Sequence, residues 1–343
     1  MQRWRKAIGL AAATVMGVTA CGGAGNSGTS QDSNTVYPMK IMVGGLSKQI
    51  YLPNMLTQQL GYFKEQKLDV TLVDEQSGVG TETMVLAGAV DAGSGSYNHT
   101  LELQPQGKFM ETVVQLQIAP GEAEMVDAKQ ADKIKTAADL KGKNLGVTEL
   151  GSGTHTLTLA LLGKAGLKST DANFVAVGAG NTFIAGMQAG KIDAGMTTEP
   201  TISRLIKAGV GKPLVDLRTP ESTRAALGGN YPFISVWMST DYVNAHKPIV
   251  QRLVNAYVKT LRWIATHSAQ EIADKMPADY YAGDKDLYVT ALAAQKSTFS
   301  PDGKMPADGP PVVADIEKYV PSMKGVTFDL AKSYTNEFVA KAP

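Results

Sequence analysis

The chain has 343 residues, of which 43% are hydrophobic and 19% charged, and its formal net charge is +1. This length is typical of about two domains, and the apolar content is enough for a buried core. The near-zero charge offers no basic footprint for nucleic acid, and the 7% aromatic content does not favour a carbohydrate-stacking groove.

The first 20 residues have the pattern of an export signal. A basic start precedes the apolar run Ala7–Val18, which is too short to span a bilayer. The ending Val18–Cys21 resembles a bacterial lipoprotein signal, in which Cys21 is lipidated and becomes the first residue of the mature protein. The alternative is ordinary cleavage after Ala20. Residues 21–37 are predicted to be a flexible tether, and because Cys21 is the only cysteine, no internal disulfide can form.

Strands and helices alternate in the following hundred residues. The predicted strands are Met39–Val43, Leu68–Val73, Val90–Gly93 and Glu111–Gln117, and the predicted helices are 51–60, Thr81–Leu86 and 97–104. Ser94–Ser96 is expected to be a turn between the third strand and its helix. This alternation indicates a mainly parallel sheet.

A second α/β unit of similar build follows a predicted crossing at Glu122–Ala128. Its expected strands are Asn144–Val147, Asn173–Val177, Ile192–Met196 and Lys212–Leu217, and its helices are Thr156–Ala165, Thr182–Gln188 and Pro200–Lys207. A second crossing near Asn230–Phe233 leads to the strand Phe233–Met238, which we expect to return to the first unit. The remaining predicted helices are Lys247–His267, Asp286–Lys296, Val312–Tyr319 and Asp329–Ala340. The expected lobes are 38–125 with 232–343, and 126–231.

One phrase occurs in both units. Ala-Gly-x-[Val/Ile]-Asp-Ala-Gly appears at Ala87–Gly93 and again at Ala189–Gly195. The repetition indicates two similar lobes, each presenting a strand end to a shared cleft. Asp91 and Asp193 within it are interpreted as residues that hold the turns at the sheet. Two crossings would make a hinge around that cleft.

Four phrases carry a family resemblance. GYFKEQKLDV at Gly61–Val70, LAGAVDAGSGS at Leu86–Ser96, DLKGKNLGV at Asp139–Val147 and AGKIDAGMTTEP at Ala189–Pro200 together resemble nitrate/sulfonate/taurine-type substrate-binding proteins of ABC transporters, from about Met39 to Val339. The resemblance implies the α/β fold of type II periplasmic binding proteins, with two lobes, two hinge crossings and a mainly parallel sheet in each lobe. The thiamine-pyrimidine-synthase-like proteins share this superfamily.

The resemblance also implies a role. We expect an exported, lipid-anchored monomer that closes on a small anion (a sulfonate, a nitrate-like ion or a carboxylate) and delivers it to a membrane permease. It would lie on the outer face of the cytoplasmic membrane or, in a Gram-negative host, in the periplasm or outer membrane. The alternatives are a pyrimidine, thiamine-precursor or other neutral heteroaromatic ligand, an enzyme on the same fold, or a sensor domain. The related synthases use a Cys-rich segment that this chain lacks. No cofactor, metal or nucleic acid is expected.

Glycine- and hydroxyl-rich turns that open helices supply the candidate ligand contacts, because helix N-termini favour anions. The donors expected from these turns are Ser47, Ser94, Ser96, Ser152, Thr154 and Asn181, and Tyr51 and Tyr97 could form walls. The alternative is that these hydroxyls only cap the N-termini of their own helices.

His99 and His155 stand at matching places, one in each lobe. Either could meet an anion as a neutral donor, or be a cap or surface histidine. Thr198 stands where family members often carry an aromatic residue, so it removes a stacking wall and adds a hydroxyl. Glu199 before Pro200 is either an N-cap or, if it faces the cleft, an acceptor for a ligand N–H.

Overall fold

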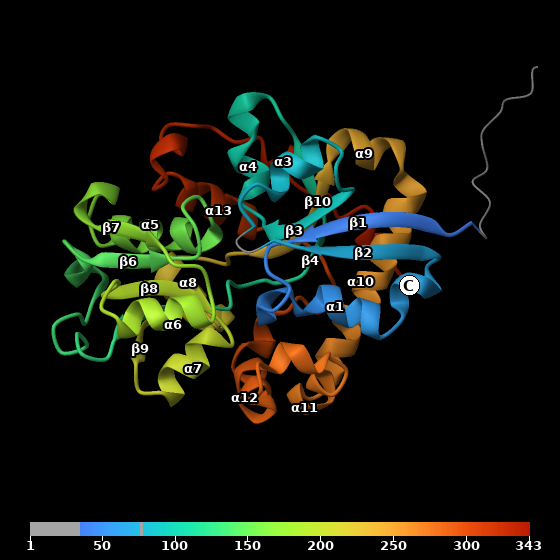
Figure 1. Ribbon diagram of the computed structural model, residues 1–343. Helices are drawn as coiled ribbons and strands as arrows, with labels where there is room; N and C mark the ends of the chain where they lie inside the picture. Colours follow the sequence, from blue (N-terminus) through green and yellow to red (C-terminus); the bar gives the residue numbers. More distant parts are fainter. Residues whose placement is uncertain (1–34, 76–77) are drawn as a thin grey trace, which may run out of the picture. The chain divides into compact units, whose positions relative to one another are not determined.

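The computed structural model describes residues 35–75 and 78–343, so the signal segment, Cys21 and most of the tether lie outside the described residues (Figure 1). Val36–Pro343 forms one compact unit built on two five-stranded sheets. The strands of the first sheet, in spatial order, are β2 (Leu68–Asp74), β1 (Tyr37–Val43), β3 (Ala92–Ser96), β10 (Ile234–Ser239) and β4 (Met110–Gln115). Those of the second are β7 (Asn173–Ala176), β6 (Asn144–Val147), β8 (Ala194–Thr198), β5 (Glu122–Asp127) and β9 (Gly211–Asp216).

The two sheets have the same plan. In each, a single strand, β10 or β5, runs antiparallel to both of its neighbours, and the other four share one direction. The prediction of two mainly parallel sheets is therefore confirmed. Each antiparallel strand follows a crossing of the chain between the sheets.

Helices cover both sheets (Figure 1). Their bounds are α1 (Leu52–Gln59), α2 (Tyr62–Glu65), α3 (Thr81–Leu86), α4 (His99–Glu102), α5 (Gly153–Lys164), α6 (Asn181–Gln188), α7 (Thr201–Lys207), α8 (Pro220–Leu227), α9 (Thr240–Ala245), α10 (Lys247–Thr266), α11 (Ala269–Ala273), α12 (Lys285–Gln295) and α13 (Gly309–Glu317). The long helix α10 buries an apolar face that includes Leu253, Tyr257 and Leu261, as its periodicity predicts. Among the described residues, no helix is long and apolar enough to cross a membrane.

The repeated aspartates have the same structural task in both sheets. The Asp91 carboxylate accepts a hydrogen bond from the Lys40 backbone N–H at 2.7 Å, and Asp193 accepts one from the Asn144 N–H at 2.9 Å. Each aspartate therefore ties the start of a central strand to its neighbour. Their interpretation as scaffold residues is confirmed.

The predicted turn Ser94–Ser96 is wrong, because these residues continue strand β3. Gly93 and Gly95 lie against the ring of Trp237 on β10, and a Cβ atom built on Gly93 would come within 2.3 Å of that ring. The small residues are thus explained by close packing across the sheet. In β8, likewise, the strand extends two residues beyond the predicted end at Met196.

Two further predictions differ from the structure. Residues 329–340 do not form one continuous helix but include short 3-10 turns at Leu330–Lys332 and from Val339. Between these turns, Ser333 accepts from the Thr112 N–H and Thr335 donates to the Thr112 carbonyl oxygen at the edge of β4. The segment Glu122–Ala128, expected to be a crossing, contains β5, a strand that pairs with β8 and β9 inside the second sheet.

Candidate functional site

A small cavity lies where residues of the two sheets meet. Its lining residues come from the first-sheet side (Lys48, Ile50, Tyr51, Ser96, His99 and Phe233) and from the second-sheet side (Glu122, Thr148, Gly153, Thr154 and Thr198). Its volume is about 20 Å³, which is room for about one water molecule. We call it the inner cavity.

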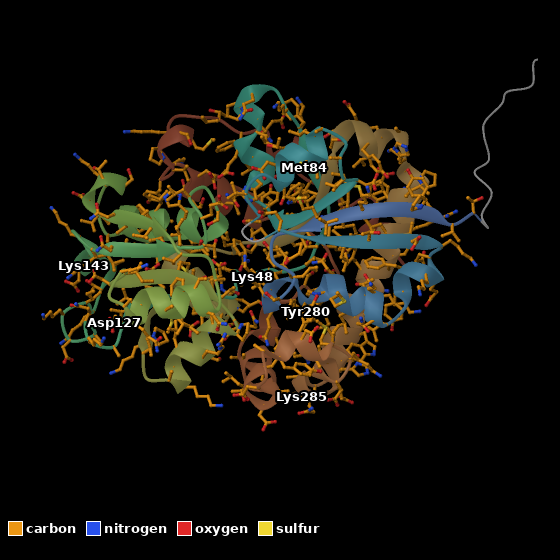
Figure 2. All side chains as sticks on the ribbon, in the orientation of Figure 1. Lys48, Met84, Asp127, Lys143, Tyr280 and Lys285 are labelled. Carbon is orange, nitrogen blue, oxygen red and sulfur yellow. The ribbon has the colours of Figure 1, made fainter. Side chains whose placement is uncertain are left out.

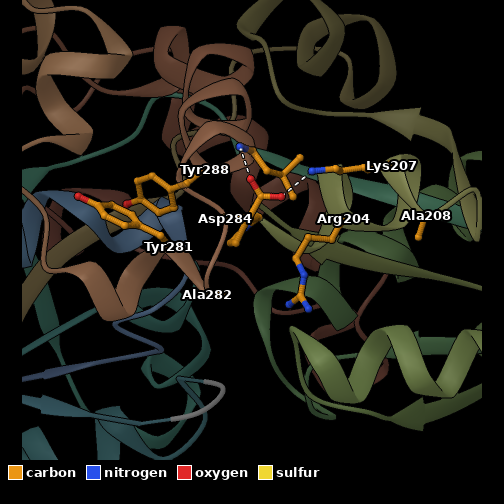
Figure 3. Close-up of a pocket in the computed structure, with 9 residues that line it drawn as sticks. Arg204, Lys207, Ala208, Tyr281, Ala282, Asp284 and Tyr288 are labelled. Atoms are coloured by element: carbon orange, nitrogen blue, oxygen red, sulfur yellow. Dashed lines mark hydrogen bonds and ion pairs between the residues drawn. The ribbon is translucent and has the colours of Figure 1, made fainter.

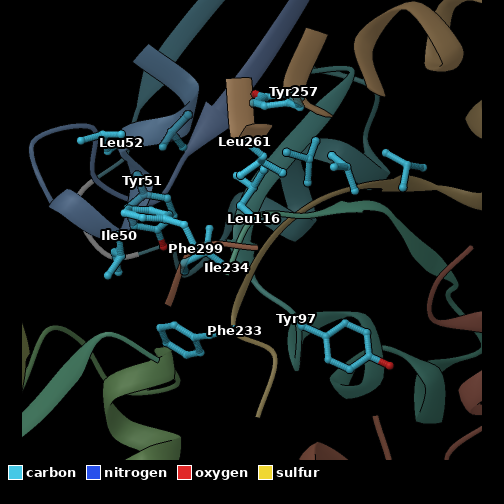
Figure 4. Close-up of a cluster of buried hydrophobic side chains, with 14 of the residues drawn as sticks. Ile50, Tyr51, Leu52, Tyr97, Leu116, Phe233, Ile234, Tyr257, Leu261 and Phe299 are labelled. Carbon is cyan, nitrogen blue, oxygen red and sulfur yellow. The ribbon is translucent and has the colours of Figure 1, made fainter. Parts of the chain in front are cut away.

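The inner cavity has apolar walls on the first-sheet side. Ile50, Tyr51 and Phe233 are at most 4% exposed. In Figure 4, the hydroxyl of Tyr51 points toward the gap in which Phe233 lies, whereas Tyr97 points away. Phe233 also touches the second lobe, because a Cβ atom added to Gly153 would come within 2.7 Å of its ring. This contact closes one side of the cavity.

The start of α5 forms the opposite wall. Gly153 and Thr154 are the first residues of this helix, so its N-terminal N–H groups and positive dipole end lie at the cavity. The hydroxyls of Thr148, Ser152 and Thr154 bond to one another at 2.7–3.0 Å. Ser152 also caps the helix, accepting from the N–H of His155 at 3.4 Å. This triangle is satisfied internally, and it holds the helix start in place.

Lys48 brings a buried ammonium group to the cavity. The residue is 8% exposed, and its Nζ donates to the carbonyl oxygen of Gly44 at 2.8 Å. Burial lowers the pKa of Lys48 to about 8, although Glu122, Glu75 and Asp74 favour the charged form. Figure 2 shows Lys48 between the blue and green parts of the chain. Its burial keeps the Lys48 side chain out of bulk solvent.

Two polar groups of the inner cavity have no hydrogen-bond partner among the described residues. They are Oε2 of Glu122 and Oγ1 of Thr198, on residues that are 2% and 1% exposed. Glu122 and Thr198 are directly paired across β5 and β8, so their side chains share one face of the sheet. Burial raises the pKa of Glu122 to about 8, against the opposing effect of Lys48. These two groups are available to a ligand.

A second buried carboxyl lies behind Glu122 on the same strand. Glu124 is fully buried, and its Oε2 accepts from the Thr158 hydroxyl at 2.9 Å. Burial raises the pKa of Glu124 to about 8, although the bond from Thr158 lowers it. Glu124 therefore belongs to the interior between β5 and α5.

The two candidate histidines do not have matching positions. His99 lines the inner cavity, and its Nδ1 lies 2.9 Å from an oxygen of Glu102. Burial disfavours the charged imidazole, but the hydrogen bond and charge of Glu102 outweigh it and raise the pKa of His99 to about 9. The expectation of a neutral His99 is therefore corrected. His155 packs edge-on against Phe174, and its Nδ1 accepts from the Gly151 N–H at 3.0 Å, away from the cavity lining.

An outer groove of about 320 Å³ adjoins the inner cavity at Lys48, which lines both. Ser47 and Glu199 line this groove. The Glu199 carboxylate forms an ion pair with Arg218 at 2.7 Å and accepts from the Ser203 N–H at 3.0 Å. Burial raises its pKa, while these contacts oppose that effect. Glu199 is therefore bound by its own lobe, although the N-cap residue of α7 is Pro200 and not Glu199.

A neighbouring pocket brings α7 close to the segment before α12 (Figure 3). Lys207 and Asp284 form an ion pair there at 2.6 Å. Both side chains are well exposed, so the pair contributes little to stability. It is nevertheless a contact between segments that pack on different sheets.

Five candidate residues line neither the inner cavity nor the outer groove, and His155 is one of them. Ser94 accepts from the Asn54 amide at 3.0 Å, and the Tyr97 hydroxyl pairs with Ser333 at 2.5 Å. Asn181 is exposed and accepts from Arg204 at 2.6 Å. Ser152 contributes only through the hydroxyl triangle. Of the candidates, the inner cavity brings together Tyr51, Ser96, His99, Thr154 and Thr198.

Sequence reasoning missed Glu122, Thr148 and Phe233 as cavity residues. Glu122 had no usable signal, because an acidic residue next to an expected crossing is typical of a solvated linker. Phe233 was identified only as the start of the return strand. Among the described residues, no group of three His, Cys, Asp or Glu side chains could hold a metal ion.

Comparison with known proteins identifies the class. The fold is that of periplasmic binding proteins: the alkanesulfonate-binding protein SsuA from Xanthomonas axonopodis pv. citri, solved bound to MOPS, matches with a TM-score of 0.67 and 20% identity over 88% of this chain and 99% of that one. The chain belongs to the NMT1/THI5-like family, which it matches over residues 51–271.

Two other relatives extend this comparison. A solved protein of Bordetella bronchiseptica RB50 is 35% identical, with a TM-score of 0.84 over 89% of this chain and 96% of that one. YtlA of Bacillus subtilis (strain 168), which is named as a binding protein, is 22% identical over 77% of this chain and 78% of that one. The likeness therefore extends over most of the chain.

Proposed function

We propose that this protein is the solute-binding component of an ABC importer and closes its two lobes on a small anion in the inner cavity. The observation that carries the proposal is the cavity between the two sheets, in which Glu122 and Thr198 keep polar atoms without a hydrogen-bond partner among the described residues. Membership of the NMT1/THI5-like family and the named binding function of its relatives support it.

The donors around the cavity favour an anion such as a sulfonate, a nitrate-like ion or a carboxylate. They are the Lys48 ammonium, the N-terminus of α5 and the Thr198 hydroxyl. Micromolar affinity corresponds to about −8 kcal/mol. A few hydrogen bonds to a charged ligand, each worth about 1.5–3 kcal/mol, can supply it together with the helix dipole.

The carboxyl group of Glu122, if it is ionised, favours a different ligand. An ionised Glu122 would accept an N–H, as an aminopyrimidine or another nitrogen heterocycle would provide, and Thr198 could assist. The test is titration calorimetry of the mature protein against alkanesulfonates, nitrate, carboxylates and pyrimidines. Heat from the anions supports the proposal, whereas heat only from neutral pyrimidines contradicts its anion part.

We further propose that the protein binds its ligand without transforming it, is exported as a monomer, and is held to a membrane through lipidated Cys21 for delivery to a permease. The lipoprotein-like ending at Val18–Cys21 motivates the anchor. Recovery of chemically unchanged ligand after long incubation supports binding without catalysis, and a changed product would contradict it.

A further inference from the structure

The carboxyl group of Glu122 is one of two polar groups of the inner cavity with a buried atom that lacks a hydrogen-bond partner among the described residues. The residue is 2% exposed, and its Oε2 has no hydrogen-bond partner among the described residues. No ion pair within 4.0 Å joins Glu122 to a described cation. A buried carboxylate without donors is strongly unfavourable, so such a group holds its proton instead.

The charges around Glu122 act in both directions. The groups that face it are Lys48, Tyr51, His99 with its partner Glu102, Glu124 and Tyr231. From α5 and β8 the uncharged Thr154 and Thr198 line the same cavity, and on β9 Asp216 is paired with Arg218. Lys48 favours the carboxylate, while burial and Glu124 favour the neutral acid, and burial is the largest effect.

A neutral Glu122 changes what the cavity can bind. A carboxylic acid has an O–H donor, whereas a carboxylate only accepts. With Glu122 neutral, the groups that line the cavity include the donors Lys48, Thr198 and the N-terminus of α5, which suits an oxyanion. With Glu122 ionised, an anion would meet a second negative charge in an enclosed space.

We infer that Glu122 sets the ligand class by remaining protonated and donating its O–H to the anion, so that the protein binds the anion together with one proton. The inference rests on the proposed function, because it concerns the same cavity. No bond other than hydrogen bonds forms or breaks, and the proton stays on Glu122 while the anion is bound. It predicts that affinity falls when Glu122 loses its proton.

The substitution Glu122→Gln separates the two protonation states. Glutamine has the shape of the neutral acid and keeps an N–H donor, but it cannot ionise. Glu124→Gln is the matched control, because Glu124 is two residues away on the same strand, is equally buried and does not line the cavity. Ethanesulfonate and nitrate are the probes, titrated by calorimetry from pH 6 to pH 9.5.

We expect the wild-type affinity to fall by up to tenfold per pH unit above about pH 8. In Glu122→Gln, affinity for the same anion should remain within a few-fold of wild type at pH 6. Above pH 8 the variant should lose much of the decline in affinity. A smaller decline should remain, because Lys48 loses its proton in the same pH range. Glu124→Gln should keep the decline, shifted toward lower pH because loss of the Glu124 charge lowers the pKa of Glu122. Loss of anion binding in Glu122→Gln, or an unchanged pH profile, overturns the inference.

A ligand-free measurement keeps this test independent of the ligand. The folded pKa of Glu122 is about 8 and the unfolded value about 4.3, so between these values only the folded state holds the proton. The folded-to-unfolded ratio of wild type should then fall, relative to Glu122→Gln, by up to tenfold per pH unit from pH 5 to pH 8. If the folded-to-unfolded ratio has the same pH dependence in wild type and in Glu122→Gln, Glu122 is ionised. That result overturns the inference while leaving the proposed function intact. If neither probe binds at any pH, the anion part of the proposed function fails, together with the coupling.

Discussion

The contact between Gly153 and Phe233 makes lobe closure sensitive to a single methyl group. Gly153 begins α5, and a Cβ atom there would lie 2.7 Å from the Phe233 ring and 3.4 Å from the Cβ of Ser96. Carbon atoms normally approach to about 3.5–4.0 Å. Its backbone does not adopt a left-handed conformation, so alanine is tolerated there when the lobes are apart.

Gly153→Ala should therefore penalise the closed state alone. Overpacking of this kind costs about 1–3 kcal/mol, which corresponds to an affinity loss of about 5- to 150-fold. The measurement is calorimetric titration with the tightest-binding anion of the panel, together with small-angle scattering of the free protein. We expect weaker binding and a larger radius of gyration.

Two controls accompany this variant. Gly186→Ala places the same methyl group in α6, where the nearest neighbour is Val177 at an ordinary 3.4 Å, and should leave binding unchanged. Phe233→Leu should restore part of the affinity in the Gly153→Ala background, measured as a coupling energy in a double-mutant cycle. Unchanged affinity and unchanged scattering in Gly153→Ala would refute the reasoning, because Phe233 would then be able to move aside without opening the lobes.

Three other substitutions test separate parts of the molecule. Lys48→Met should weaken anion binding by about 10- to 150-fold through loss of a charged donor worth about 1.5–3 kcal/mol; equal affinity in calorimetry would exclude Lys48 from the site. Gly93→Ala should lower the free energy of unfolding by at least about 1–3 kcal/mol, because its methyl group would meet Trp237 at 2.3 Å; a urea titration with an unchanged midpoint would contradict this. Cys21→Ala should move the protein from the membrane to the soluble fraction or stall its processing, and retention of a fully cleaved variant on membranes would contradict lipidation.

The fold was more predictable than the site because the periodicity that defines strands and helices is local. The alternation of elements gave both sheets, and the repeated phrase identified β3 and β8 as equivalent strands. Strand β5 was not predicted because its sequence, EAEMVD, places carboxyl groups where a buried strand normally has apolar residues. Burial of Glu122 and Glu124 depends on α5 and β8, which are distant in the sequence.

The histidines show why equivalence in sequence does not imply equivalence in the site. His99 and His155 each follow a small-residue segment, but the segment before His99 is a strand under Trp237 and the one before His155 is a helix cap. Strand β3 brings Ser96 to the inner cavity and the start of α4 brings His99, whereas the cap formed by Ser152 precedes His155, which packs against Phe174. The two lobes share a scaffold plan but supply different chemistry: the first provides the cations and aromatic walls, and the second provides the carboxyl group, the hydroxyls and a helix N-terminus. An asymmetric site of this kind cannot be read from a repeated motif, because the repeat preserves only the aspartates that build the sheets.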